Sequence, residues 1–369
     1  MKEVRLGIIG VGQIGKSHLR NYSEVPGAKM VAAADIDGPE LKRVAEQFGI
    51  PHTYKDFRQL LKRDDIEAVD VCLHNNFHSP VSVAAMRAGK HVYCEKPLAG
   101  SYVDAKAMVD AAKEYKRNLH MQLGTLYSKE TKAARRLIEV GLLGKLYHGR
   151  ATGFRRRGRP FVDGYGTASF VKKEVAAGGA LYDMGVYHIG QMLYLLGLPE
   201  VLRISGKVYQ ETGMDPGRRE SSGYNVEELG LGFVRLAGGI TMDMIESWAI
   251  HLNEFESSSV VGSKGGIRLR PFGFYTTQSD IEMDSTFDLD SWDWREGQLR
   301  PDQHDAFRSS QHHWIAALQK RVKLLPTGEI GLKTMLVSEG IYLSDRLGRE
   351  VSAEEVLKAS KSSAVKFRR

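Results

Sequence analysis

The sequence has few cysteines and no long apolar segment, and each absence excludes a class of protein. Only two cysteines, Cys72 and Cys94, occur among 369 residues, each within an apolar stretch. This excludes a disulfide framework and is typical of a reducing compartment. No apolar run reaches the roughly 18 residues of a membrane span, and the N-terminus carries no apolar signal segment. We therefore expect a cytoplasmic protein without a membrane partner.

Concentrated charge is also absent. Lys and Arg number 52 against 45 Asp and Glu, a net charge of +7. Only two short basic clusters stand out, at residues 155–159 and 366–369. A nucleic-acid-binding protein would gather more charge on one face, so no nucleic-acid partner is expected. Hydrophobic residues make up 42% of the chain, which is enough for the cores of two folded domains.

The first third of the chain alternates buried strands with helices. Continuous apolar runs predict strands at Val4–Ile9, Met30–Ala34, Ala68–Leu73, His91–Cys94 and Leu119–Leu123. The intervening patterns predict helices at Lys16–Val25, Glu40–Phe48, Pro80–Ala88 with Ser79 as N-cap, and Tyr102–Tyr115 after Ser101. This alternation predicts an α/β fold, a Rossmann-type doubly wound parallel sheet.

The pattern changes near Gly124, where we place the boundary between a first domain, residues 1–124, and a second domain, residues 125–369. Alternating patterns predict strands at Val201–Val208, Glu227–Val234, Gly239–Trp248, Ser257–Val261 and Gly266–Leu269. Helices are predicted at Thr131–Val140, Gly179–Leu196, Asp305–Lys320 and Ile330–Arg346, with loops at Thr212–Gly223 and Asp280–Asp293. The second domain is therefore expected to be α+β, with an open and mostly antiparallel sheet.

A glycine motif for dinucleotide binding follows the first strand. Gly10, Gly12 and Gly15 form a G-x-G-x-x-G motif, with Gln13 and Ile14 between the last two glycines. The glycines permit a tight turn, close approach of a pyrophosphate and close helix packing. Asp35 ends the second strand, where a carboxylate accepts the adenosine ribose hydroxyls. Asp37 follows, and no Lys or Arg occurs before Lys42, which favours NAD over NADP.

Two later segments carry candidate catalytic residues. Glu95-Lys96-Pro97 follows the fourth strand, and ligands bind beyond the carboxyl ends of such strands. Asp183 and Tyr187 are four residues apart in a predicted helix and would share one face. His188 would lie about 140° from Asp183 at about 100° per residue. The sequence therefore predicts a site with Lys96, Asp183 and Tyr187.

Together these motifs resemble the glucose-fructose oxidoreductase / inositol dehydrogenase / MocA (Gfo/Idh/MocA) family, over nearly the whole chain. The resemblance rests on the glycine motif, Glu95-Lys96-Pro97 and the Gly-Gly-x-x-x-Asp-x-Gly-x-Tyr run that ends at Tyr187. It implies that residues 1–124 are an NAD(P)-binding Rossmann domain and that residues 125–369 are a substrate-binding and oligomerisation domain, whose sheet often forms dimers or tetramers. It also implies redox chemistry on sugars or polyols. It further implies that Lys96 is the catalytic lysine and that Asp183 orients the substrate.

The resemblance leaves the proton carrier open. The position four residues after the aspartate is His in one branch of the family and Tyr in another; here it is Tyr187, with His188 next to it. The spacing favours Tyr187, whose pKa of about 10 an adjacent Lys96 would lower. His188 would need no such help. The loop after the third strand retains Asn75 and His78, for which cofactor contacts are expected. The cofactor-binding residues expected are Gly10, Gly12, Gln13, Ile14, Gly15, Asp35, Asn75, His78, Glu95 and Lys96.

Three functions are compatible with these motifs. The leading hypothesis is an NAD-dependent dehydrogenase that acts on a secondary alcohol of a sugar, sugar derivative or cyclitol. The second keeps NAD bound through a redox-assisted glycoside hydrolysis or epimerisation. The third is a non-enzymatic, nucleotide-sensing regulator, which the retention of Lys96 and Asp183 disfavours. An arginine of the 155–159 run would either bind a substrate anion or hydroxyl pair or lie in a solvated loop.

Two further expectations concern metals and assembly. His304, His312 and His313 have no carboxylate or cysteine at ligand spacing, and no H-E-x-x-H motif occurs, so we expect no metal site. We expect a homodimer or homotetramer formed through the outer face of the second sheet. The Ile, Met and Trp side chains of Gly239–Trp248 would otherwise form an exposed apolar patch.

Overall fold

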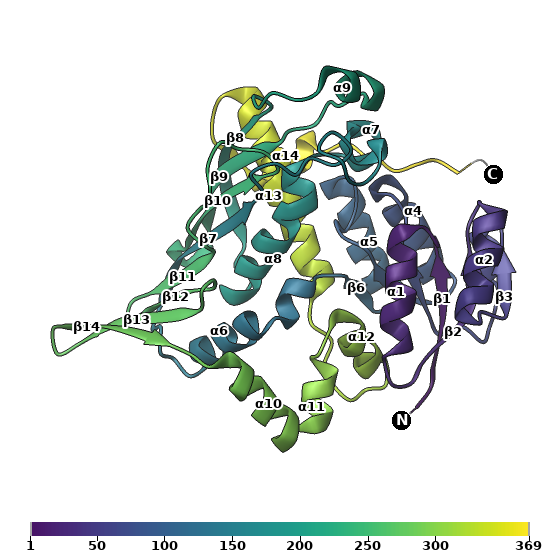
Figure 1. The fold of residues 1–369 in the computed structure, drawn as a ribbon, viewed down its shortest axis with the longest axis horizontal. Helices are drawn as coiled ribbons and strands as arrows, with labels where there is room; N and C mark the ends of the chain where they lie inside the picture. Colours follow the sequence, from purple (N-terminus) through teal and green to yellow (C-terminus); the bar gives the residue numbers. More distant parts are fainter. Residues whose placement is uncertain (1, 368–369) are drawn as a thin grey trace.

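The structure, a computed structural model, describes residues 2–367, so Arg368 and Arg369 of the second basic cluster lie outside the described residues. Two sheets form the molecule, with helices α8 and α13 between them (Figure 1). The hairpin β13–β14 projects away from the rest of the chain (Figure 1). None of the described helices is long and apolar enough to cross a membrane.

The first sheet has six parallel strands in the order β3-β2-β1-β4-β5-β6, which confirms the predicted Rossmann fold. Its strands are β1 (Val4–Ile9), β2 (Ala28–Ala34), β3 (His52–Tyr54), β4 (Ala68–Val71), β5 (His91–Cys94) and β6 (Leu119–Met121). Its helices are α1 (Gln13–Ser23), α2 (Gly38–Phe48), α3 (Phe57–Leu61), α4 (Asn75–Arg87) and α5 (Tyr102–Glu114). The prediction missed β3 and α3, because a three-residue, partly exposed edge strand has no apolar run.

Helix α4 begins five residues earlier than predicted, at Asn75 rather than Pro80. Ser79 is not its N-cap; the Ser79 hydroxyl donates to the carbonyl of Asp104. Pro80 lies inside the helix and has no N–H to donate to the carbonyl of Asn76. The N–H of Val365, in the C-terminal segment, donates to that carbonyl instead at 3.0 Å. A long-range bond therefore satisfies the group that the proline leaves free.

The second sheet has nine strands in the order β14-β13-β12-β11-β7-β10-β9-β8-β15. All neighbouring pairs are antiparallel except β10 and β7, which confirms a mostly antiparallel sheet. Its strands are β7 (Leu146–Phe154), β8 (Val201–Tyr209), β9 (Leu229–Leu236), β10 (Thr241–Ser247), β11 (Ser259–Gly262), β12 (Gly266–Arg268), β13 (Gly273–Gln278), β14 (Ile281–Thr286) and β15 (Val351–Ser352).

Helices cover one face of this sheet and continue around the first domain (Figure 1). They are η1 (Gly124–Tyr127), α6 (Lys129–Glu139), η2 (Ala168–Val171), α7 (Lys173–Ala176), η3 (Leu181–Gly185), α8 (Val186–Leu195), α9 (Pro216–Ser222), η4 (Ala237–Gly239), α10 (Leu289–Leu299), α11 (Pro301–Ala306), α12 (Ser310–Leu318), α13 (Thr327–Leu347) and α14 (Ala353–Ala359). Trp314 of α12 packs with Leu6 and Tyr93 of the first sheet. The last third of the chain therefore contributes to the core of the first domain.

Three predictions about this half of the chain were wrong. The expected loop Thr212–Gly223 contains α9, which begins after the capping side chain of Asp215 and ends at Gly223 in the left-handed conformation. The expected loop Asp280–Asp293 contains β14 and the start of α10. The expected helix Asp305–Lys320 is two helices, because α11 ends at Ala306 and the Ser309 side chain caps α12.

Candidate active site

The glycine loop between β1 and α1 is shaped for close approach of a ligand to the backbone. Gly10 has a φ of 95°, which favours glycine. A Cβ on Gly15 would lie 2.2 Å from the carbonyl oxygen of Gly10, whereas a Cβ on Gly12 would meet nothing within 4 Å. Gly12 is the N-cap of α1 and offers no side chain to its first N–H groups. With Gln13 and Ile14 exposed in the first turn, this geometry fits a pyrophosphate.

Asp35 lies beside this loop at the end of β2. Its carboxylate accepts hydrogen bonds from the N–H groups of Val11 at 2.8 Å and Asp37 at 3.0 Å. The side chain of Asp37 caps α2 by accepting from the N–H of Glu40. Lys55, after β3, lies against Gly38, so a cation does approach this loop although none is nearby in sequence.

Lys96 and Asp183 form an ion pair across the two domains. Lys96 follows the carboxyl end of β5, and its Nζ donates to Asp183 Oδ1 at 2.8 Å and to the Asp183 carbonyl at 3.0 Å. Burial alone would lower the pKa of Lys96, but the interactions with Asp183, Tyr187 and Glu95 together outweigh burial and raise it. Lys96 is therefore an ammonium group at neutral pH, a hydrogen-bond donor and not a base.

The second oxygen of Asp183 has two further neighbours. Trp248 Nε1 donates to Oδ2 at 3.0 Å, and a guanidinium nitrogen of Arg155 lies 3.6 Å from the same oxygen. Burial raises the pKa of the Asp183 carboxyl, but Lys96, with Arg155 and Trp248, outweighs burial and lowers it. Asp183 is thus ionised and held by groups from the segments that follow β5, β10 and β7.

Tyr187 lies on the other side of Lys96. The Lys96 Nζ is 4.8 Å from the centre of the Tyr187 ring. The expectation that Lys96 would lower the pKa of Tyr187 is wrong for the net effect: burial outweighs the ammonium and raises the pKa above 10. The helical-wheel argument also needs correction, because η3 (Leu181–Gly185) is a π-helix with fewer than 100° per residue, followed by α8.

His188 points toward the second sheet and pairs with a buried carboxylate. Its Nδ1 lies 3.0 Å from Oε1 of Glu246, a residue of β10 whose side chain is fully buried. Burial lowers the pKa of His188, but the charge of Glu246 outweighs burial and raises it above 6.5. The His188 side chain is 25% exposed, so the ring has a solvent-accessible part as well as a carboxylate partner.

Asn75 and His78 occupy the loop after β4 and the start of α4. The Asn75 side chain donates to the carbonyl of Ala176 in the second domain at 2.7 Å. The ring nitrogens of His78 lie 2.8 Å from the Pro97 carbonyl oxygen and 2.9 Å from that of Leu73. His78 is fully buried, so its ring braces the segment after Lys96.

Comparisons with known proteins identify the family of this chain. A family model described as "Oxidoreductase family, NAD-binding Rossmann fold" matches residues 4–123, and the "GFO/IDH/MocA C-terminal domain" matches residues 131–268. The chain belongs to the Gfo/Idh/MocA family. It is therefore an NAD-binding oxidoreductase with the fold that the sequence predicts.

Similar proteins of this family have sugar and cyclitol names. D-glucoside 3-dehydrogenase of Escherichia coli is 30% identical over 281 residues, which cover 74% of this chain and 79% of that protein. Myo-inositol 2-dehydrogenase of Thermotoga maritima is 29% identical over 194 residues, 53% of this chain and 55% of that protein. A solved levoglucosan dehydrogenase, in complex with NADH and levoglucosan, superposes with a TM-score of 0.77 at 21% identity, covering 95% of this chain and 100% of that chain. At that identity the last likeness shows the fold alone.

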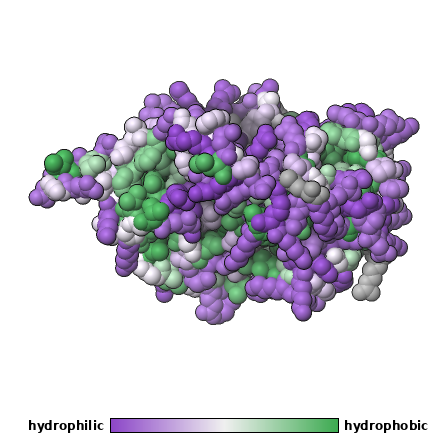
Figure 2. Space-filling view, turned by 90° about the horizontal axis from the view of Figure 1, so that it is seen from below, coloured by the Kyte–Doolittle hydropathy of each residue, from purple (hydrophilic) through white to green (hydrophobic). Residues whose placement is uncertain are grey.

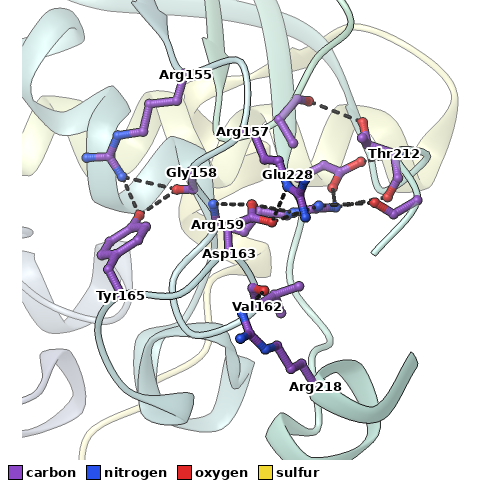
Figure 3. Close-up of polar contacts among 12 residues, drawn as sticks. Arg155, Arg157, Gly158, Arg159, Val162, Asp163, Tyr165, Thr212, Arg218 and Glu228 are labelled. Carbon is purple, nitrogen blue, oxygen red and sulfur yellow. Dashed lines mark hydrogen bonds and ion pairs between the residues drawn. The ribbon is translucent and has the colours of Figure 1, made fainter. Parts of the chain in front are cut away.

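In this Gfo/Idh/MocA protein the arginines of the 155–159 run have different surroundings (Figure 3). Arg159 is 1% exposed and bonds to Asp163 and Glu228, so it is not in a solvated loop. Arg157 is 74% exposed and pairs with Asp163. Arg155 points away from both, toward the hydroxyl of Tyr165 (Figure 3) and Asp183. Arg155 is thus the arginine of this run that lies beside the Lys96–Asp183 pair.

The sequence interpretation missed a buried polar cluster under Glu95. His18, Asp70 and Cys72 lie together there, and their side chains are of types that bind metals. Two signals were present: Asp70 is the one charged residue in the apolar run Ala68–Leu73, and His18 shares a helix face with Gly15. Glu246 and Trp248 were also missed as site residues, because their role depends on β10 packing against η3 and α8.

Proposed function

We propose that this protein is an NAD-dependent dehydrogenase that oxidises a secondary alcohol of a sugar, sugar derivative or cyclitol. The observation that carries the proposal is the Lys96–Asp183 ion pair, at 2.8 Å, beyond the carboxyl end of β5. Parallel α/β sheets bind ligands at that edge. The sugar and inositol dehydrogenases of the same family support the substrate class.

The cofactor would be held by the glycine loop and Asp35. When bound there, NAD would supply the hydride acceptor for the carbinol carbon of the substrate. The free N–H groups at the start of α1 would bind the pyrophosphate, and Asp35 would accept the ribose hydroxyls with the lone pairs that Val11 and Asp37 leave free. Asn75 at the start of α4 and the Glu95-Lys96 segment border the same edge of the sheet.

Lys96 and Asp183 would bind the reacting part of the substrate. An ammonium group has three N–H donors, and Asp183 accepts two of those of Lys96. The ammonium also interacts with the Tyr187 hydroxyl. A substrate oxygen bound between Lys96 and Tyr187 would have its negative charge stabilised by the ammonium as the hydroxyl proton leaves. The Asp183 carboxylate retains lone pairs for a neighbouring sugar hydroxyl. Arg155 and Tyr165 would border the sugar on the side of the second domain.

Because Lys96 stays protonated, another group must take the hydroxyl proton. We assign this role to Tyr187, whose ring lies against the Lys96 ammonium. As a neutral phenol, Tyr187 is ready to donate a proton when the carbonyl compound is reduced, and oxidation needs its phenolate. His188 is the alternative proton carrier. Its Nδ1 lies beside Glu246, and its other ring nitrogen could accept a proton.

A panel of sugars and inositols, followed by NADH absorbance, tests the function. We expect one NADH per substrate oxidised, and loss of turnover in Lys96→Ala but not in the control Lys106→Ala, which removes an exposed lysine of α5 that pairs with Asp110. No NAD binding, or full activity of Lys96→Ala, would refute the proposal. Cleavage or epimerisation of a glycoside without net NADH release would instead establish the redox-assisted reaction.

We further propose a cytoplasmic homodimer or homotetramer formed through the outer face of the second sheet. The basis for this differs from the sequence argument, because Met242, Met244 and Trp248 are buried on the inner face. Of the apolar residues in β10, Ile245 is the half-exposed one. Ile245 is paired with Leu231 of β9, near the exposed Phe233. Figure 2 shows apolar side chains gathered beside the projecting hairpin β13–β14, at the end of the molecule that holds the second sheet. Two free, buried cysteines support a reducing compartment.

A further inference from the structure

The imidazole of His18 lies between two buried carboxylates behind the Lys96 segment. Nδ1 is 2.8 Å from Asp70 Oδ2, and Nε2 is 2.7 Å from Glu95 Oε1. The His18 side chain is 2% exposed, and those of Asp70 and Glu95 are buried with it. An ionised carboxylate only accepts hydrogen bonds, so the ring must donate from both nitrogens. With both carboxylates ionised, the two contacts place a proton on each ring nitrogen, so the ring is an imidazolium.

The other polar groups around the ring are neutral. The Sγ of Cys72 lies 3.2 Å from His18 Nδ1 and donates to Asp70 Oδ1, also at 3.2 Å. The rings of Tyr22 and Tyr93 lie nearby, with Tyr93 edge-on to His18. Burial raises the pKa of all three groups. Burial would lower the pKa of His18, but the interactions with Asp70 and Cys72 together outweigh burial and raise the pKa well above 6.5.

Glu95 connects this cluster to the catalytic lysine. Its second oxygen, Oε2, accepts a hydrogen bond from the backbone N–H of Lys96 at 2.9 Å. Burial raises the pKa of Glu95, but His18 and Lys96 outweigh burial and lower it. Charges therefore alternate from the core to the cleft, from Asp70 through His18, Glu95 and Lys96 to Asp183. Each charge has an opposite neighbour, as buried ions require.

We propose that His18, as an imidazolium, is a positioning residue that holds the Glu95 carboxylate. Through Glu95 it fixes the backbone of Lys96, and so the place from which the Lys96 ammonium reaches the reacting oxygen. His18 touches neither substrate nor the reacting atoms; it acts through Glu95. The inference rests on the proposed function, because its kinetic readout is dehydrogenase turnover. Its second readout, the protonation state of the ring, does not depend on turnover.

Replacing His18 by glutamine should lower kcat to an extent that depends on pH. In His18→Gln, Glu95 loses the cation that lowers its pKa while Asp70 still faces it, so the pKa of Glu95 rises. At low pH Glu95 takes up a proton and the repulsion from Asp70 is relieved; at high pH Glu95 is ionised and the repulsion is complete. A small displacement of a catalytic group costs up to about 100-fold. We expect kcat to fall about 10- to 100-fold at pH 8 and less at pH 5.5, with little change in KM.

A second substitution and a matched control separate positioning from general destabilisation. His18→Gln combined with Asp70→Asn removes one carboxylate with the cation, and we expect most of kcat and a flat pH dependence to return. The control, His120→Gln, alters another fully buried histidine of the same domain, which bonds to Thr327 and has no carboxylate partner. We expect the control to lower the melting temperature and leave the pH profile of kcat unchanged. A pH-independent defect in His18→Gln, without rescue by Asp70→Asn, would overturn the proposal.

Nitrogen NMR of the full-length, histidine-labelled protein tests the ring itself. The His18 signals, assigned by their absence from the double variant, should show both nitrogens protonated at pH 8. A neutral tautomer, or a stoichiometric metal ion bound through His18 in the purified protein, would overturn the proposal. If no sugar is oxidised but the imidazolium is present at pH 8, the proposed function fails and the charge state assigned to His18 stands. If sugars are oxidised and the ring is neutral, the positioning role fails alone.

Discussion

Replacing Tyr187 by phenylalanine tests the proton carrier while changing little else. Phenylalanine keeps the ring that lies 4.8 Å from the Lys96 ammonium and removes only the O–H group. Loss of a positioned acid or base costs about 10²- to 10⁴-fold in rate, which is about 3 to 5 kcal/mol of transition-state stabilisation. We expect Tyr187→Phe to lower kcat by this factor and to leave the Kd of NAD near that of the wild type, measured by fluorescence titration.

The pH dependence gives a second, independent readout of the same variant. Burial raises the pKa of Tyr187 above 10 despite Lys96, so the phenol is protonated over the neutral range. The rate of alcohol oxidation should therefore rise with pH toward an alkaline limb, and the rate of carbonyl reduction should fall along the same limb. Both limbs should disappear in Tyr187→Phe, measured by stopped-flow NADH absorbance in the two directions.

His188→Asn is the comparison that decides between the two residues. We expect it to retain most of kcat but to lose stability, because Glu246 remains buried without its cation, a loss of up to about 3 kcal/mol. The folded-state pKa of His188 is raised, so this stabilisation is complete below pH of about 6.5 and disappears as pH rises through the folded-state value. Melting curves at pH 5.5 and 9 measure it. If His188→Asn loses more kcat than Tyr187→Phe, and the limb lies near the histidine range, the assignment to Tyr187 is refuted.

Three further predictions follow from other parts of the structure. NAD should bind at least tenfold more tightly than NADP, about 1.4 kcal/mol, because Asp35 and Asp37 repel a 2′-phosphate. Lys55→Ala should increase this difference in affinity, because it removes the cation near the loop. Equal affinities by calorimetry would contradict the prediction. Arg159→Met should lower the free energy of unfolding in urea by about 3 to 5 kcal/mol, because Asp163 and Glu228 stay buried without their cation. Arg157→Met, at an exposed arginine, should lower it by less than about 1 kcal/mol. Equal losses in the two variants would disprove this account. Phe233→Glu should dissociate the assembly in sedimentation velocity at micromolar concentration, and a monomeric wild type would rule out the proposed interface.

The sequence alone was sufficient for the features that depend on local order. The strand at Val4–Ile9, the glycine loop after it and the N-cap at Ser101 were predicted correctly, because short-range sterics and capping decide them. The parallel sheet followed from apolar runs that need burial on both faces. The predicted start of α4 was wrong because a proline is typical of the first position of a helix. Inside the helix, Pro80 leaves the carbonyl of Asn76 without its helical donor, and the distant N–H of Val365 supplies the hydrogen bond.

Tertiary structure decided what depends on charges that meet through space. Lys96 and Asp183 are 87 positions apart, and their pairing sets the charge of both. The sequence predicted that Lys96 lies beside Tyr187. It did not show how deeply Tyr187 is buried, and this burial outweighs the effect of Lys96 on the pKa of Tyr187. His18, Asp70 and Glu95 come from α1, β4 and the end of β5, and no local pattern gives their contact. Coulomb energies depend on distance and burial, and neither is written in the order of the residues.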